Sequence, residues 1–108
     1  MREKYWWLTD ESKSMLERGY LLPNQTVEEK LNIICKYAAS FYKEEWLKDK
    51  FLELFERGWC SLSSPIWANF GEDRGLPISC FNTYIPDSMD GIYGSLHEIA
   101  METKLGGG

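Results

Sequence analysis

The fold of this chain is constrained most by its one strand-like segment, residues 76–85, which is rich in Ile, Phe, Thr and Tyr. A single strand cannot pair its own backbone N–H and C=O groups, so it needs a sheet supplied from elsewhere. The chain has 108 residues, room for about one domain, and most of the remaining sequence favours helices. We therefore predict a mainly α fold with one or two strands that belongs to a larger structure.

Helical signals dominate the first half of the chain. Thr9 can cap a helix that continues to about Arg18 and stops at Gly19. The Thr26-Val-Glu-Glu29 sequence is a capping box, and the apolar residues after it recur at helical spacing. A further helix is predicted over residues 44–57, with Gly58 as its C-cap.

The pattern changes after residue 58. Residues 59–75 are rich in Ser, Gly and Pro and show no helical periodicity, so we expect an ordered, aromatic-lined loop. The strand-like segment follows and is broken by Pro86. A last helix is predicted over residues 89–104, capped by Asp87 or Ser88.

Composition excludes several classes of protein. The net charge is -5 and the Lys and Arg residues are scattered, which argues against binding to a nucleic-acid polymer. No apolar run is long enough to span a bilayer, and no signal peptide is recognisable. The three cysteines are odd in number and lack metal-site spacing, so we expect reduced thiols, no metal site and a cytoplasmic protein.

The cysteines differ in what their surroundings predict. Cys35 lies on the apolar stripe of a helix and is expected in the core, and packing is also the default for Cys60. Cys80 lies within the strand-like segment after Ser79. A buried structural thiol is the usual role for such a residue, whereas a redox role requires a second thiol.

For several other polar residues, the sequence is consistent with either a ligand-binding role or a purely structural one. Ser64, before Pro65, can present its hydroxyl to a ligand or simply form a turn. Asp87 and Ser88 can contact a ribose or phosphate or only cap the last helix. The three glycines that begin at Gly106 allow close approach of a ligand but are a weak signal alone.

The order and spacing of four motifs carry more information than any single residue. Together they resemble the large, catalytic subunit of class I ribonucleotide reductase, and the motifs are residues 58–71, 74–81, 88–92 and 104–108. Residues 1–58 resemble the helical region that precedes the catalytic barrel of this family. Residues 59–108 resemble the first strand and helix of the α/β barrel, which is incomplete here. The resemblance implies an N-terminal fragment without the ATP cone that many members carry.

The resemblance also implies roles for individual residues. Cys80 matches the first of the two barrel cysteines that reduce the substrate and become a disulfide. Positions that hold the substrate ribose and phosphate match Ser64 and Ser79, and a glycine that contacts the substrate through its backbone matches Gly106. The loop that binds a deoxynucleotide effector at the specificity site matches Asp87, Ser88 and Met89. The helix over residues 89–104 matches a helix at the dimer interface.

The family's radical-bearing cysteine, second redox cysteine and most barrel strands are expected beyond Gly108, so the fragment is expected to be inactive alone. The resemblance implies no cofactor bound by this chain itself, but a deoxynucleotide or ATP effector. Its implied partners are the remainder of the large subunit, a second large subunit, a metal-containing small subunit that supplies the radical, a ribonucleotide substrate, and thioredoxin or glutaredoxin. The alternative is a non-catalytic helical interaction module in which Cys80 is merely buried.

Overall fold

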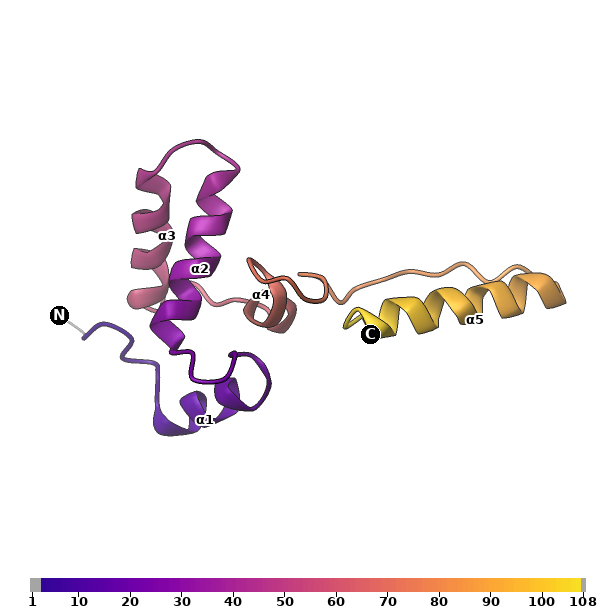
Figure 1. The fold of residues 1–108 in the computed structure, drawn as a ribbon, viewed down its shortest axis with the longest axis horizontal. Coiled ribbons are helices and arrows are strands. Elements are labelled where there is room, and N and C mark those ends of the chain that lie inside the picture. The colour runs from indigo at the N-terminus through magenta and orange to yellow at the C-terminus, as the bar shows by residue number, and fades with distance from the viewer. Residues whose placement is uncertain (1–2, 108) are drawn as a thin grey trace.

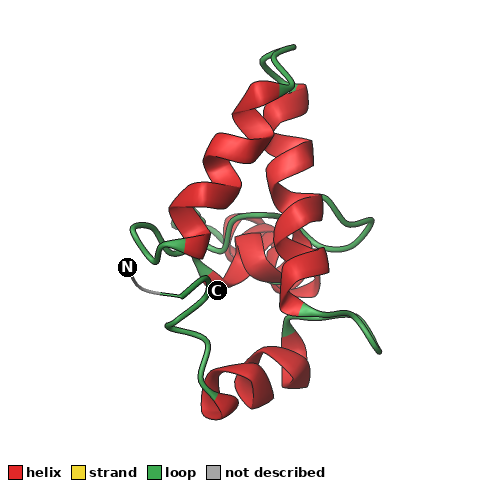
Figure 2. Ribbon diagram, turned by 90° about the vertical axis from the view of Figure 1, so that its left-hand side faces the viewer, coloured by secondary structure: helices red, strands yellow, loops and turns green. Residues whose placement is uncertain are grey.

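The computed structural model describes residues 3–107, and these residues form five helices and no β-strand (Figures 1 and 2). The helices are α1 (Asp10–Gly19), α2 (Val27–Ser40), α3 (Trp46–Glu56), α4 (Ser64–Asn69) and α5 (Met89–Lys104). Helices α1 to α4 form a body in which α2 and α3 pack antiparallel. Residues 76–85 and α5 lie side by side as an arm that projects from this body, and the molecule measures 60 × 35 × 24 Å.

Three of the predicted helix starts are confirmed by their caps. The Thr9 hydroxyl accepts a hydrogen bond from the Ser12 amide at 3.2 Å. At α2 the capping box is complete, since the Glu29 amide donates to the Thr26 hydroxyl at 3.1 Å and the Thr26 amide donates to the Glu29 carboxylate at 2.8 Å. Ser88 caps α5 by accepting from the Gly91 amide at 3.0 Å. These bonds join residues three apart, so the local sequence is sufficient to specify them.

The core lies where α1, α2 and α3 meet. Its buried apolar residues are Leu16, Leu21, Val27 and Leu31. The aromatic N-terminal segment lies across the end of α3, where the Trp7 indole N–H donates to the Phe55 carbonyl at 2.7 Å. The amide of Tyr5 donates to the Glu56 carbonyl at 2.9 Å. This segment therefore covers the core and also donates to carbonyls in the last turn of α3, where the Phe55 carbonyl additionally accepts from the Gly58 amide at 3.0 Å.

The prediction of a loop throughout residues 59–75 is wrong, because α4 forms within it. Pro65 occupies the first turn, where its fixed φ favours a helix and its missing N–H is not needed. Near the other end of this short helix, the Ala68 carbonyl accepts from Arg74 Nε at 2.8 Å. Six residues are too few to show helical periodicity, so this tertiary bond is not visible in the sequence pattern.

The strand predicted over residues 76–85 does not form within the part of the chain that is described. The segment is extended, but it has no neighbouring strand and lies along α5 instead (Figure 1). The Leu76 amide donates to the Leu105 carbonyl at 3.2 Å, and the Ser95 hydroxyl donates to the Tyr84 carbonyl at 3.1 Å. Composition favoured an extended backbone, but a strand also requires a partner in a sheet.

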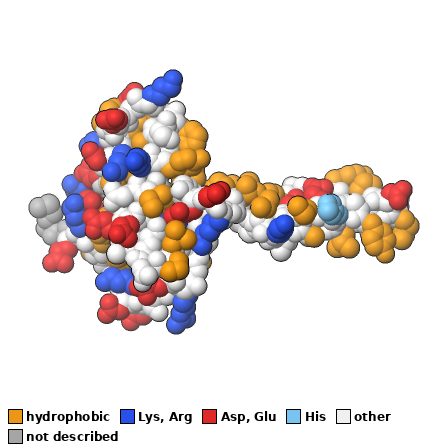
Figure 3. All heavy atoms as spheres, viewed as in Figure 1, with side chains coloured by type: hydrophobic (Ala, Val, Ile, Leu, Met, Phe, Trp, Pro, Cys, Tyr) orange, Lys and Arg blue, Asp and Glu red, His pale blue; other side chains and the backbone are white. Residues whose placement is uncertain are grey.

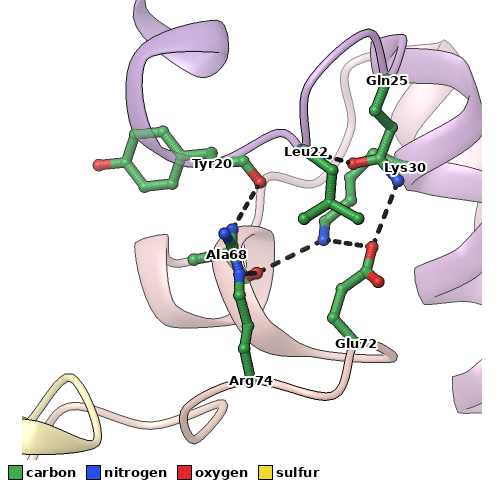
Figure 4. A network of polar contacts seen from close by, with 7 residues as sticks. All are labelled: Tyr20, Leu22, Gln25, Lys30, Ala68, Glu72 and Arg74. Atoms are coloured by element: carbon green, nitrogen blue, oxygen red, sulfur yellow. Dashed lines mark hydrogen bonds and ion pairs between the residues drawn. The ribbon is translucent and has the colours of Figure 1, made fainter.

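An ion pair joins α2 to the loop that follows α4 (Figure 4). Lys30 is fully buried, and its Nζ lies 2.9 Å from the Glu72 carboxylate. The Gln25 amide nitrogen donates to the same carboxylate at 3.2 Å. The hydrogen bond from Lys30 is the largest cause that holds the pKa of Glu72 below its usual value. Arg74 bridges this region to the end of α1 through the Tyr20 carbonyl, at 3.3 Å.

Glu72→Gln is expected to destabilise the fold strongly, because it leaves the Lys30 ammonium buried without a counter-charge. Breaking a buried pair in this way costs about 3–5 kcal/mol, measured as the free energy of unfolding in urea. Because the pKa of Glu72 is lowered in the folded state, this stabilisation is present at neutral pH and is lost as the pH falls through that lowered pKa.

The matched control is Asp10→Asn, which removes an exposed carboxylate 4.0 Å from Lys13. That change should cost less than about 1 kcal/mol. Equal effects of the two substitutions would show that the Lys30–Glu72 pair contributes no more than a surface contact.

Candidate functional site

The candidate site is centred on the extended segment of the arm, which carries Ser79 and Cys80. Cys80 is exposed and Ser79 is half-buried, and neither side chain makes a hydrogen bond within residues 3–107. The alternative of a buried structural thiol therefore has no support from the position of Cys80 within residues 3–107. An exposed thiol on a segment without strand partners is accessible to a ligand or to a second thiol.

Ser64 begins α4, in the body of the molecule. Its exposed hydroxyl accepts a hydrogen bond from the Tyr20 phenol at 3.4 Å, a long bond for two hydroxyls. Because Tyr20 donates, the hydrogen of Ser64 remains available for another acceptor. The sequence singled out Ser64 but gave no signal for Tyr20, which is 44 residues away along the chain.

The end of α5 and the glycine run lie beside the Cys80 segment (residues 76–85) at two positions, Leu76 and Phe81. The Leu105 carbonyl, next to Gly106, accepts from the Leu76 amide at 3.2 Å. A Cβ placed on Gly107 would lie 2.4 Å from the ring of Phe81, the residue after Cys80. The structure thus brings the Cys80 segment and the neighbourhood of Gly106 together, as a shared site requires.

Asn69, at the end of α4, links this contact to the body. Its side-chain amide donates to the Leu76 carbonyl at 2.7 Å. The same amide nitrogen would lie 3.7 Å from a Cβ on Gly106. Asn69 carries no recognisable signal in the sequence, because it lies in a stretch without helical periodicity.

Asp87, Ser88 and Met89 lie at the other end of the arm, where the extended segment turns into α5 (Figure 1). All three are exposed. The prediction left open whether Asp87 or Ser88 caps the helix, and the structure assigns the cap to Ser88. The length of α5, about 24 Å for 16 residues, separates these residues from Gly106.

The arm also exposes much apolar surface (Figure 3). Ser95 is the one buried residue of α5. The exposed large apolar side chains of this helix are Met89, Ile92, Tyr93, Leu96, Ile99 and Met101. Exposure on this scale is typical of a surface that contacts further protein.

The other two cysteines lie in contrasting environments. Cys35 is buried in α2 as predicted, and burial raises the pKa of its thiol to about 12. Cys60 is exposed, so the expectation that it packs in the interior is wrong. Residues 3–107 contain no group of three or more His, Cys, Asp or Glu arranged to hold a metal ion. None of the described helices is long and apolar enough to cross a membrane.

Comparisons with known proteins agree on one family. No protein-family model matches the chain. The ribonucleoside-diphosphate reductase large subunits of invertebrate iridescent virus 6 and vaccinia virus are 30% and 33% identical to it, each over 86% of the chain. The alpha subunit of Synechocystis is 31% identical over 87%. The Actinobacillus ureae class Id ribonucleotide reductase alpha subunit matches the whole chain, with a TM-score of 0.94 and 46% identity.

The chain belongs to the large-subunit family of class I ribonucleotide reductases. It spans only 10–13% of the length of these curated relatives and 21% of the Actinobacillus ureae chain. The mainly helical fold agrees with the match to part of a large subunit. The residue roles implied by the resemblance therefore concern one segment of a large subunit, and they are treated below as proposals.

The exposure of the thiols predicts their order of reaction. At pH 8 an alkylating reagent should modify Cys60 and Cys80 of the folded segment within minutes and leave Cys35 intact. A pKa of about 12 leaves roughly one Cys35 thiol in ten thousand as the reactive thiolate at this pH, and the thiol is also buried.

Peptide mass spectrometry after timed quenching measures the three rates. The urea-unfolded chain is the control, in which all three cysteines should react at similar rates. Modification of Cys35 as fast as that of Cys80 in the folded chain would contradict the packing of α2.

Proposed function

We propose that this chain supplies one redox thiol and part of the substrate site to a ribonucleotide reductase large subunit, which reduces ribonucleotides to deoxyribonucleotides. The observation that carries the proposal is the exposed Cys80, on an extended segment that lies beside the end of α5 and the glycine run at Leu76 and Phe81. Reduction at the ribose 2′-carbon releases water and consumes two electrons, which a pair of thiols provides when it becomes a disulfide. Cys80 is one thiol of that pair, and the other belongs to the remainder of the subunit.

Three residues of the segment are proposed to hold the substrate. Ser64 and Ser79 offer hydroxyls to the ribose and phosphate, and Gly106 contributes its backbone. The Tyr20 hydrogen bond supports this role for Ser64, because it leaves the Ser64 hydrogen directed to another acceptor. The absence of a Cβ at Gly106 permits a ligand to approach the main chain closely.

The extended segment is proposed to become the first strand of the catalytic α/β barrel when the remaining strands are present. Most of its backbone groups have no hydrogen-bond partner within residues 3–107, which is the condition for pairing with further strands. The barrel, the second thiol and the radical site belong to the remainder of the subunit. The segment alone is therefore expected to be inactive.

The proposed partners follow from this role in the cytoplasm. A metal-containing small subunit supplies the radical, and thioredoxin or glutaredoxin reduces the disulfide after each turnover. The exposed apolar face of α5 supports a position at the interface of a large-subunit dimer. Asp87, Ser88 and Met89 are proposed to bind a deoxynucleotide or ATP effector at the end of the arm remote from Gly106.

The alternative, a non-catalytic interaction module, takes Cys80 to be a buried packing residue. The thiol is exposed in the structure, so this reading has no support from the environment of Cys80. The exposed apolar side chains of α5 are equally consistent with contacts to the remainder of a large subunit.

Cys80→Ser is expected to abolish multiple turnover without changing the fold, because serine is close in size to cysteine but cannot form a disulfide. The assay is dithiol-dependent reduction by the complete large subunit, meaning this chain joined to the remaining residues. The Actinobacillus ureae subunit, 46% identical over this chain, can supply those residues.

Cys35→Ser is the control, since it replaces a buried thiol remote from the proposed chemistry. It should lower stability and leave the reaction of correctly folded enzyme unchanged. Retention of near-parent turnover by Cys80→Ser would remove the redox role from this residue.

Asp87→Ala is expected to weaken effector binding about tenfold or more, because it removes a carboxylate proposed to accept hydrogen bonds from the ribose or base. Loss of one charge-assisted bond costs roughly 1.5–3 kcal/mol. The measurement is effector titration of the complete large subunit. Since Ser88 provides the cap of α5, Asp87→Ala should leave the helix content of the protein unchanged.

Ser88→Ala provides the comparison, because it removes the cap itself and should lower the stability of α5 by about 1 kcal/mol. Unchanged effector affinity in Asp87→Ala would exclude this carboxylate from the effector site.

A further inference from the structure

One residue, Asn69, lies where the three segments of the proposed site meet. It ends α4, whose first residue is Ser64, and its side-chain amide donates to the Leu76 carbonyl at the start of the Cys80 segment. The same amide nitrogen would lie 3.7 Å from a Cβ on Gly106. We infer that Asn69 is a positioning residue that fixes the Cys80 thiol relative to the glycine run. This inference rests on the proposed function, because it assigns Asn69 a task in that same reaction.

The contact acts on the backbone rather than on a side chain. The Leu76 carbonyl accepts from the Asn69 amide at 2.7 Å, and the Leu76 amide donates to the Leu105 carbonyl at 3.2 Å. Both backbone polar groups of Leu76 are therefore engaged, one by α4 and the other by the end of α5. Cys80 lies four residues further along. A shift of the backbone at Leu76 would therefore also shift the position of the Cys80 thiol.

The neighbouring glycine shows how close this contact is. A Cβ on Gly75 would lie 2.7 Å from the Asn69 amide nitrogen and 2.9 Å from its oxygen, both too close for a side chain. Gly75 also has a φ of +57°, which side-chain-bearing residues adopt with strain. The chain before Leu76 thus leaves room for the Asn69 amide only because residue 75 is glycine.

Contacts with the body hold the residue before Asn69 in place. The carbonyl of the preceding residue, Ala68, accepts from Arg74 Nε at 2.8 Å and lies 3.5 Å from Lys30 Nζ (Figure 4). Lys30 is fully buried and paired with Glu72. Polar contacts therefore hold the residue before Asn69 to the body, and the Asn69 amide in turn holds the Cys80 segment.

The amide group is required for this contact. Aspartate has the same shape, but it has no N–H and would place a negatively charged oxygen against the Leu76 carbonyl. Alanine would leave that carbonyl without its donor. Either change releases the backbone at Leu76, and a displacement of the thiol of about 1 Å is sufficient to slow a reaction that depends on orientation.

The test uses the complete large subunit with its small subunit, and compares the parent with Asn69→Asp and Asn69→Ala. Asn82→Asp is the matched control, because Asn82 is exposed on the same segment and makes no hydrogen bond within residues 3–107. We expect both Asn69 variants to lower kcat about tenfold, with the KM for the ribonucleoside diphosphate and the effector dissociation constant within about twofold of the parent. Asn82→Asp should match the parent in all three.

Two results would overturn the inference. One is a parental kcat in both Asn69 variants. The other is a parallel loss of kcat, substrate affinity, effector affinity and thermal midpoint, which would make Asn69 a general structural residue. If Asn69→Asp does not fold, Asn69→Ala carries the same comparison. Failure of the proposed function is recognised separately, because Cys80→Ser would then retain turnover whatever the Asn69 variants do.

Discussion

The buried ammonium of Lys30 is the constraint on which the rest of the structure depends. A charge removed from water must be paired, and in this fold the counter-charge comes from Glu72, 42 residues further along the chain. The requirement fixes the loop after α4 against α2. Arg74 and Asn69 on either side of Glu72 are placed by the same requirement, and through them the start of the Cys80 segment is placed.

The body and the arm are stabilised by different interactions. In the body, Leu16, Val27 and Leu31 are buried against aromatic side chains, so apolar burial closes the structure. In the arm, the extended segment is held to α5 mainly by backbone carbonyls and amides, and the apolar side chains of α5 remain exposed. The arm therefore has a defined path but little buried surface of its own, as expected of a part completed by other protein.

The sequence predicted those features that depend on neighbouring residues. The Thr26–Glu29 capping box and the bounds of α5 were predicted correctly, because each is determined within a few residues. The prediction failed where distant contacts decide the result. Helix α4 depends on Arg74 and Lys30, and the strand over residues 76–85 requires partner strands that the described residues do not provide.

The residues of the candidate site also fall into two groups, those proposed from the sequence and those seen only in the structure. Cys80, Ser64 and Gly106 were identified by the order of motifs along the chain. Tyr20 and Asn69, which support them, are ordinary residues in the sequence, and only their contacts distinguish them. Candidate site residues can be proposed from a pattern, whereas the residues that contact them become visible only when distant segments are brought together.

The tight packing of Gly107 bears on mutational tolerance at this end of α5. Gly106 has a φ of +92°, so substitution there is resisted by backbone strain. At Gly107 the resistance is steric, because a methyl group would collide with the Phe81 ring and would lie 2.8 Å from the Glu102 carbonyl oxygen. Substitution of these two adjacent glycines is therefore resisted for unrelated reasons, and a side chain at Gly107 would displace Phe81, the residue after Cys80.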